Sequence, residues 1–337
     1  MSKWLLRGFF STLKWALCAV GAVALLLVAL IATPLTRPPE LHSLSASRST
    51  IDFSALPPIE RFQARDGTML GFRHYAASGP ATGRGAIVIH GSSGSSGTSI
   101  HPLSGALASR GVETWAIDIR GHGTSGTRGD IGYVGQLEDD LADFVAAVRN
   151  TAPTLPLTLL GHSAGGGFAL RVAGSPIQNL FVRTVLLAPY LGYDAPTNQP
   201  NSGGWANPDI PRVVGLMALR KLGIFCCEAL PTLAFAVPPN SEDLLVPAYS
   251  DRLMRNFATR GYRTDLAAAT RPLTIFSGAA DELMLADKYA DAVHAVAPSV
   301  DVKLIEGVNH IGIVSTPKAV SVIAEDVATR GIAGTSS

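Results

Sequence analysis

One serine of the sequence stands in a pattern that can make it a nucleophile. Ser163 lies in the pentapeptide GHSAG, and no other serine has glycine both two residues before it and two residues after it. The apolar segment LPLTLL precedes the pentapeptide, and the helix-like segment AGGGFALRVA follows it. In a tight turn between a strand and a helix, small residues let the chain pass and the serine hydroxyl is pushed out above the sheet. The pattern therefore predicts a nucleophilic serine at position 163.

A serine hydroxyl needs a base that takes its proton and an acid that orients this base. Two histidines follow Ser163: His294 lies within a helix-like segment, whereas His310 lies in a loop directly after the strand-like segment VDVKLI. Asp281 comes just after the strand-like segment LTIFSG, and Glu282 beside it is the alternative acid. Ligand-binding groups lie at the carboxyl ends of parallel strands. We therefore predict that Ser163, His310 and Asp281 act together.

The apolar strand GAIVIH is followed by an unusual loop, GSSGSSGTS. The loop lacks the lysine of a phosphate-binding loop and the G-x-G-x-x-G spacing of a dinucleotide site. Its place between elements of one sheet excludes an interdomain linker. We expect its Ser92 to supply one backbone N–H of an oxyanion hole, and Ala164, which follows the nucleophile, to supply the other. His90, which precedes the loop, is expected to be structural.

The elements that must position these residues alternate along the chain from about residue 61. Short apolar segments are separated by segments of helical spacing, such as residues 137–150. Asp66-Gly67 lies between two strand-like runs, which indicates a hairpin. The alternation predicts an α/β fold with a parallel sheet covered on both faces. It lapses at about residues 191–270, where we expect a cap over one edge of the sheet.

The N-terminal region differs from the rest of the chain. Residues 1–36 contain about 20 consecutive apolar residues, enough to span a bilayer as a helix. Lys3, Arg7 and Lys14 precede this run, which predicts a single-pass anchor with the remaining chain extracytoplasmic. The alternative is a secreted protein with a cleaved signal peptide, but the small-x-small site at residues 22–24 lies inside the apolar run. Residues 37–60, rich in proline and serine, are predicted to be a tether to a domain at 61–337.

Composition excludes several classes of function. The chain of 337 residues is 47% hydrophobic and 16% charged with a net charge of +1, which gives no support for nucleic-acid binding. Its three cysteines, Cys18, Cys226 and Cys227, form no disulfide framework. No histidine pair has metal-ligand spacing. We expect neither a metal nor a cofactor.

These motifs together resemble those of a known family. With Ser163, Asp281 and His310 so placed, and with the segments HGSSG and DIRGHGTSG (118–126), the chain from about residue 61 resembles the α/β-hydrolase superfamily. Within it, the chain is similar to the lysophospholipase and monoacylglycerol lipase-like branch, also described as serine aminopeptidase-like. The resemblance implies a mostly parallel eight-stranded sheet with a cap after the sixth strand, and a loop-stabilising role for His122. The serine-rich loop departs from this branch because it lacks bulky residues.

The expected function is that of a membrane-anchored serine hydrolase that cleaves carboxylic esters through an acyl-enzyme. The apolar cap segment at residues 213–237 favours a small lipophilic ester, such as a lysophospholipid or a monoacylglycerol. The same three residues also serve serine peptidases, thioesterases and acyltransferases. A catalytically inactive hydrolase fold that acts as a membrane-tethered binding module is the alternative from another class.

Overall fold

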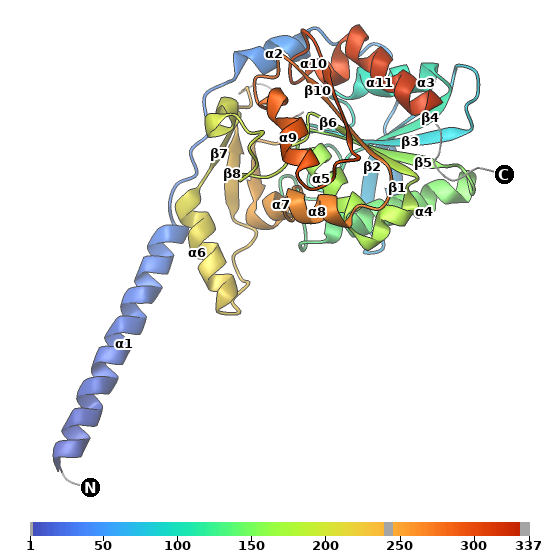
Figure 1. Ribbon diagram of the computed structural model, residues 1–337. Coiled ribbons are helices and arrows are strands. Elements are labelled where there is room, and N and C mark those ends of the chain that lie inside the picture. The colour runs from blue at the N-terminus through green and yellow to red at the C-terminus, as the bar shows by residue number, and fades with distance from the viewer. Residues whose placement is uncertain (1–2, 239–244, 331–337) are drawn as a thin grey trace.

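The computed structural model describes residues 3–238 and 245–330, and an eight-stranded sheet lies at its centre (Figure 1). The strand order is β1-β2-β4-β3-β5-β6-β10-β11. Strand β2 is antiparallel to β1 and to β4, and the other neighbouring strands are parallel. This arrangement confirms the predicted, mostly parallel sheet. The strands are β1 (Glu60–Gln63), β2 (Met69–Tyr75), β3 (Arg84–Ile89), β4 (Val112–Ile117), β5 (Leu157–His162), β6 (Arg183–Leu187), β10 (Leu273–Gly278) and β11 (Asp301–Ile305).

Helices cover both faces of the sheet, as the alternation of segments predicts. The central strand β3 shows why its sequence is apolar throughout: Ile87 and Ile89 enter the core on one face, whereas Ala86 and Val88 enter the core on the other. All four are fully buried, because successive residues of a strand point to opposite faces. The covering helices are α3 (His101–Ser109), α4 (Gln136–Thr151), α5 (Ala164–Ala173), α9 (Tyr289–His294), α10 (Gly312–Ser315) and α11 (Pro317–Thr329).

The hairpin expected at Asp66-Gly67 joins β1 to β2. The backbone N–H of Ala64 donates to the carbonyl of Thr68, and Gly67 has a φ of +85°. A positive φ is readily accessible to glycine, which explains its place in this turn.

A separate group of elements lies between β6 and β10, where the sequence predicts the cap. It contains a three-stranded sheet in the order β7-β8-β9 and the helices α6, α7 and α8. Residues 239–244 of the predicted cap lie outside the described residues. The cap elements are β7 (Ala206–Pro208), α6 (Ile210–Lys221), β8 (Pro231–Phe235), β9 (Ala248–Ser250), α7 (Asp251–Asn256) and α8 (Tyr262–Ala268).

The N-terminal helix α1 (Lys3–Ile31) projects away from the domain (Figure 1). Its segment Phe10–Ile31 has a mean hydropathy of 2.4 and is long and apolar enough to cross a membrane. The C-terminal end of α1 packs beside α6 and is hydrogen-bonded to it. Arg212 donates from Nε to the carbonyl of Ile31 at 2.9 Å, and also donates to the carbonyl of Thr33. The hydroxyl of Thr33 donates to Asp209 at 2.8 Å.

The segment predicted as a tether contains a short helix, α2 (His42–Ser49), that packs against the domain. Its sequence, HSLSASRS, is mostly polar and has a single large apolar residue, Leu44, which is buried. Such a sequence has no apolar repeat, so periodicity does not indicate a helix. Tertiary contacts at Leu44 and Arg48 hold it instead.

Candidate active site

Ser163 lies between β5 and α5 in a strained backbone conformation, with φ +54° and ψ −119°. The two glycines of GHSAG are required because the structure leaves no room for a Cβ atom at either position. A Cβ atom on Gly161 would lie 2.1 Å from the carbonyl oxygen of Gly165, and one on Gly165 would lie 2.2 Å from the carbonyl oxygen of His90. The strain is therefore held by close packing on both sides of the serine, as in a nucleophile elbow.

The two predicted partners of Ser163 lie after β10 and β11, at the same edge of the sheet. Asp281 Oδ2 and His310 Nδ1 are 2.8 Å apart, and both side chains are buried. The other oxygen of Asp281, Oδ1, accepts the backbone N–H groups of Leu283 and Met284 at 2.8 Å each. These bonds fix the carboxylate, which then holds the proton of the imidazole on Nδ1 and leaves Nε2 free to act as a base. His310 and Ser163 line the same small cavity.

Glu282, the alternative acid, binds a different part of His310. Its Oε2 accepts the backbone N–H of His310 at 2.9 Å. His162 contributes from the other side, because its Nε2 donates to the backbone carbonyl of His310 at 3.0 Å. Burial lowers the pKa of His162 well below its usual value, so this histidine is neutral. The structure thus places Asp281 on the ring of His310, while Glu282 and His162 hold its backbone.

The loop after β3 passes beside Ser163, as expected for an oxyanion loop. Ser92 lines the cavity, and its Oγ accepts the indole N–H of Trp205 at 2.8 Å. Within the described residues, no backbone hydrogen bond from the N–H of Ser92 or of Ala164 is present. Both amides are therefore available to a ligand, in the positions where the sequence predicts oxyanion donors.

Two other serines of this loop hold it in place, Ser93 through its hydroxyl and its backbone N–H and Ser96 through its backbone N–H. Ser93 has a φ of +68°, its N–H donates to Tyr249 Oη at 2.6 Å, and its hydroxyl donates to the carbonyl of Val246 at 2.6 Å. The N–H of Ser96 donates to Asp118 Oδ1 at 2.7 Å. Serine hydroxyls and backbone amides therefore fasten the loop to the cap and to the segment after β4.

The segment DIRGHGTSG supports this loop and does not reach the reacting groups. Asp118 accepts from Ser96 and, through Oδ2, from the N–H of Thr124 at 3.0 Å. His122 Nε2 is hydrogen-bonded to Tyr249 Oη, the same hydroxyl that binds Ser93. This contact agrees with a loop-stabilising role for His122. His90 binds the neighbouring carbonyl of Gly91 through Nδ1, and His294 binds the carbonyl of Val300 through Nε2.

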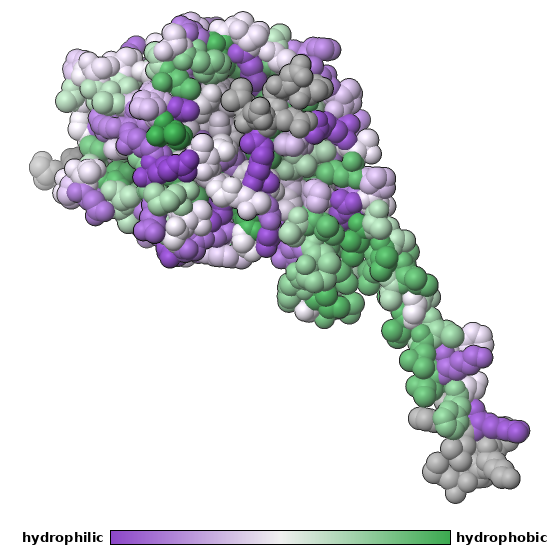
Figure 2. Space-filling view, turned by 180° about the vertical axis from the view of Figure 1, so that it is seen from behind, coloured by the Kyte–Doolittle hydropathy of each residue, from purple (hydrophilic) through white to green (hydrophobic). Residues whose placement is uncertain are grey.

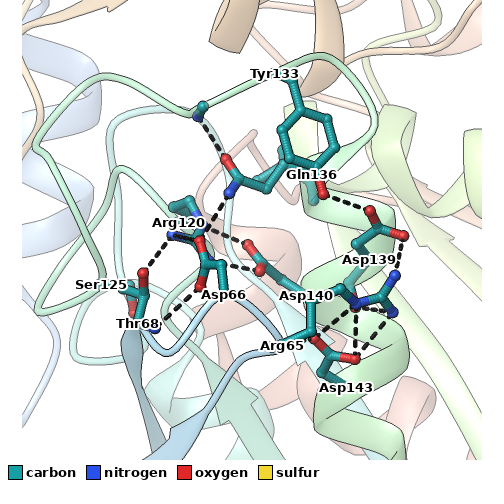
Figure 3. Close-up of polar contacts among 12 residues, drawn as sticks. Arg65, Asp66, Thr68, Arg120, Ser125, Tyr133, Gln136, Asp139, Asp140 and Asp143 are labelled. Carbon is teal, nitrogen blue, oxygen red and sulfur yellow. Dashed lines mark hydrogen bonds and ion pairs between the residues drawn. The ribbon is translucent and has the colours of Figure 1, made fainter.

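Arg120, from the same segment, is the centre of a buried ion-pair network (Figure 3). Its Nε and Nη2 donate to the two carboxylate oxygens of Asp140 at 2.8 Å each. It also contacts Asp66, in the turn between β1 and β2, and donates to Thr68 at 3.0 Å. The network ties the start of α4 to the first hairpin and to the segment that carries Asp118.

Replacing Arg120 with methionine is expected to lower the free energy of unfolding by about 3–5 kcal/mol, because it leaves the Asp140 carboxylate buried without its partner. Urea denaturation measures the loss. Arg65→Met is the matched control, since Arg65 pairs with Asp139 and Asp143 but its side chain is 50% exposed, and an exposed pair contributes about 0–1 kcal/mol. Equal losses in the two variants would contradict this reading of the network.

The space above Ser163 is small because α2 covers it. The cavity measures about 10 Å³, which is room for about one water molecule. Leu44 and Arg48 of α2 and Trp205 of the cap line it, together with Ser163 and His310. Sequence reasoning missed these three residues. They lie far from the motifs in the chain, and each is brought to the site by a tertiary contact.

A larger cavity of about 620 Å³ lies at another part of the domain, against β1, β2, β4 and α4. Phe62, Phe72, Trp115 and Phe144 are among its lining residues, and none of the predicted site residues reaches it. Within the described ranges, no group of three or more histidine, cysteine or acidic side chains is arranged to hold a metal ion.

Comparison with known proteins agrees with this architecture. A monoacylglycerol lipase from Mycolicibacterium smegmatis is 36% identical to the chain over 86 residues, which are 25% of this chain and 30% of that protein. The matched region thus spans about a third of the curated relatives' length.

Two solved structures show the same fold at low identity. A soluble variant of the monoglyceride lipase of Saccharomyces cerevisiae has a TM-score of 0.62 and 17% identity, and covers 83% of this chain and 96% of its own. A bacterial membrane phospholipase A has a TM-score of 0.54 and 16% identity, and covers 95% of this chain and 97% of its own. The family described as serine aminopeptidase, S33, matches residues 83–313, more than half of the sequence. The chain therefore belongs to this family of α/β hydrolases.

Proposed function

We propose that this protein is a serine hydrolase that cleaves carboxylic esters through an acyl-enzyme intermediate. Ser163 Oγ attacks the ester carbonyl while His310 Nε2 takes its proton. Asp281 stabilises the imidazolium that forms, and the amides of Ser92 and Ala164 bind the oxyanion. His310 then gives the proton to the leaving alcohol. A water molecule, activated by the same histidine, releases the acid and restores the serine hydroxyl.

One observation supports this proposal most directly. The hydrogen bond between Asp281 and His310 lies at the same edge of the sheet as Ser163, whose backbone is strained. Asp281 is fixed by two backbone N–H groups, so the pair is rigid before any substrate binds. Pre-organised groups of this kind have little need to reorient during the reaction, which is how serine hydrolases lower their barrier.

A membrane location and a lipophilic substrate are part of the proposal. The helix α6 packs beside α1. Together with the turn after it, α6 exposes apolar side chains, among them Ile210 (57% exposed), Leu222 (65%) and Phe225 (64%). Figure 2 shows a hydrophobic lobe directly beside the projecting helix α1. If α1 anchors the chain in a membrane, this lobe of the cap meets the bilayer surface. The monoacylglycerol lipase and membrane phospholipase A named above support lipid esters as the substrate class.

Labelling with a fluorophosphonate, which reacts with activated serines, tests the core of the proposal. The full-length protein in detergent is expected to be labelled and Ser163→Ala is expected not to be. Ser99→Ala is the matched control because Ser99 lines the same cavity, and it should keep the label. An unlabelled wild type, or a labelled Ser163→Ala variant, would refute the proposal. Monoacylglycerols of graded chain length test the lipid part separately, since a preference for acetyl esters contradicts it.

A further inference from the structure

Helix α2 supplies two side chains to the wall of the proposed active site. Leu44 and Arg48 are four residues apart, so they lie on the same face of the helix. Both line the cavity that contains Ser163 and His310. A substrate bound at Ser163 would therefore lie close to these side chains.

Arg48 is partly buried, and it differs from the buried arginines of the described chain because its guanidinium has no carboxylate partner. Its Nε is buried without a hydrogen-bond partner, and among the described residues no carboxylate pairs with its guanidinium. Burial lowers the pKa of Arg48 to about 10, so it still carries its charge at neutral pH. By contrast, the side chains of Arg120, Arg171, Arg183 and Arg212, all 10% exposed or less, each pair with a carboxylate.

The guanidinium of Arg48 is held next to the oxyanion loop. It lies over the ring of Trp205, 5.1 Å from the ring centroid, and the N–H of this indole binds Ser92 Oγ at 2.8 Å. An ester whose carbonyl binds the amide of Ser92 therefore has its neighbouring groups close to Arg48. A partly buried charge whose Nε has no hydrogen-bond partner is less well solvated than a charge in water, and an anion bound beside it offsets this loss.

Helix α2 is short, and few contacts hold it over the site. It has eight residues and no side-chain bond at its N-terminal cap. Helices this short are unstable on their own, so its position depends on tertiary contacts. These are the packing of Leu44, the Arg48–Trp205 contact and a hydrogen bond of 2.8 Å from Asn309 to Ser47. Because the cavity is small, an ester can enter it only if Leu44 moves, and the long side chain of Arg48 can then stay in contact with the substrate.

We propose that Arg48 makes the site selective for esters that carry a negatively charged oxygen group, a phosphate or a carboxylate, next to the scissile bond. This inference rests on the proposed hydrolase function and narrows its substrate class. The guanidinium offers paired N–H donors that match both groups. An anionic substrate forms an ion pair with the guanidinium of Arg48, and this interaction offsets the loss of the α2 contacts. A neutral ester leaves the charge of Arg48 unpaired.

The test compares three hexanoyl esters with the full-length protein in neutral detergent, each below its micelle concentration. These are 1-hexanoylglycerol, its 3-phosphate, and O-hexanoyl lactate, which carries a carboxylate. Wild type is expected to hydrolyse at least one anionic ester with a higher kcat/KM than the neutral ester, and the better one identifies the group. Arg48→Gln should lower kcat/KM for that ester by about 10- to 100-fold, because a charge-assisted hydrogen bond is lost, and should change the neutral ester by less than about threefold.

Two further variants separate recognition from structure. Arg48→Lys keeps the charge and should recover part of the anionic preference. Arg271→Gln removes an exposed arginine two residues before β10 and should have no effect. Equal losses on all three esters in Arg48→Gln, or a wild type that prefers the neutral ester or hydrolyses none, would overturn the inference. Fluorophosphonate labelling distinguishes this from failure of the proposed function, since a labelled wild type without anionic preference is still a serine hydrolase.

Discussion

The variant Asp281→Asn is expected to lower kcat by about 10⁴-fold, with little change in KM. In the wild type, Asp281 Oδ2 accepts the proton of His310 Nδ1, which leaves Nε2 free to take the serine proton. An asparagine that places its NH₂ group at this position favours the other tautomer, in which Nε2 carries the proton and cannot act as a base. The charge that stabilises the imidazolium is also lost. Steady-state hydrolysis of a monoacylglycerol measures the effect.

Glu282→Gln is the control for this prediction, because Glu282 is the neighbouring acid and binds only the backbone N–H of His310. A glutamine oxygen can accept the same bond, so kcat should fall by less than about tenfold, which is the loss of about 1 kcal/mol for one weakened hydrogen bond. If Glu282→Gln were the more damaging change, the assignment of Asp281 as the orienting acid would be wrong.

The stability of the protein is expected to fall steeply as the pH drops from 6.5 to 5. Burial lowers the pKa of His90, His122 and His162 below the usual value, and His122 and His162 lie well below it. In this pH range the unfolded chain binds protons at these histidines and the folded protein does not, so acid favours unfolding. His122 and His162, whose pKa values lie well below the usual value, each contribute about 1.4 kcal/mol per pH unit below about pH 6.5, and together about 3 kcal/mol per unit. His90 adds to the loss in the same direction.

Urea denaturation at pH 7, 6 and 5 measures this dependence before the carboxylates titrate. His162→Gln keeps a side-chain N–H for the carbonyl of His310 but cannot be protonated, so its profile should be flatter by about 1.4 kcal/mol per pH unit. His42→Gln is the control, because the side chain of His42 is 90% exposed. A wild-type stability that stays constant between pH 7 and 5 would show that these histidines are not held neutral.

The parts of the site that could be predicted from the sequence are those set by local order. The strained turn at Ser163 depends on glycines two residues away on each side, and Asp281 and His310 each follow a strand of the sheet. A parallel sheet brings the ends of its strands together whatever the intervening chain does. For this reason, the positions of the strands and of the loops that follow them are enough to predict that these three distant residues lie at one edge of the sheet.

The parts that could not be predicted depend on contacts between distant polar residues. Arg48 lies in a serine-rich segment that is typical of a tether, and only its fit against Trp205 shows that it enters the site. Ser93 is similar, since its bonds to Tyr249 and Val246 join residues about 150 positions apart. Neither contact leaves a periodic pattern, because each uses a single side chain and not the repeated face of a helix or strand.

The bonds between Arg212 and the end of α1 have a consequence for work with shortened forms of the protein. Because Arg212 binds the carbonyls of Ile31 and Thr33, the N-terminal helix is fastened to the cap and not to the central sheet. A fragment that begins at residue 38 would remove both acceptors from a nearly buried guanidinium and the Thr33 hydroxyl from Asp209. Such a fragment therefore differs from the full chain in the contacts of its cap as well as in the loss of α1. Kinetic constants measured on the fragment would describe an enzyme whose cap lacks its hydrogen bonds to the N-terminal segment.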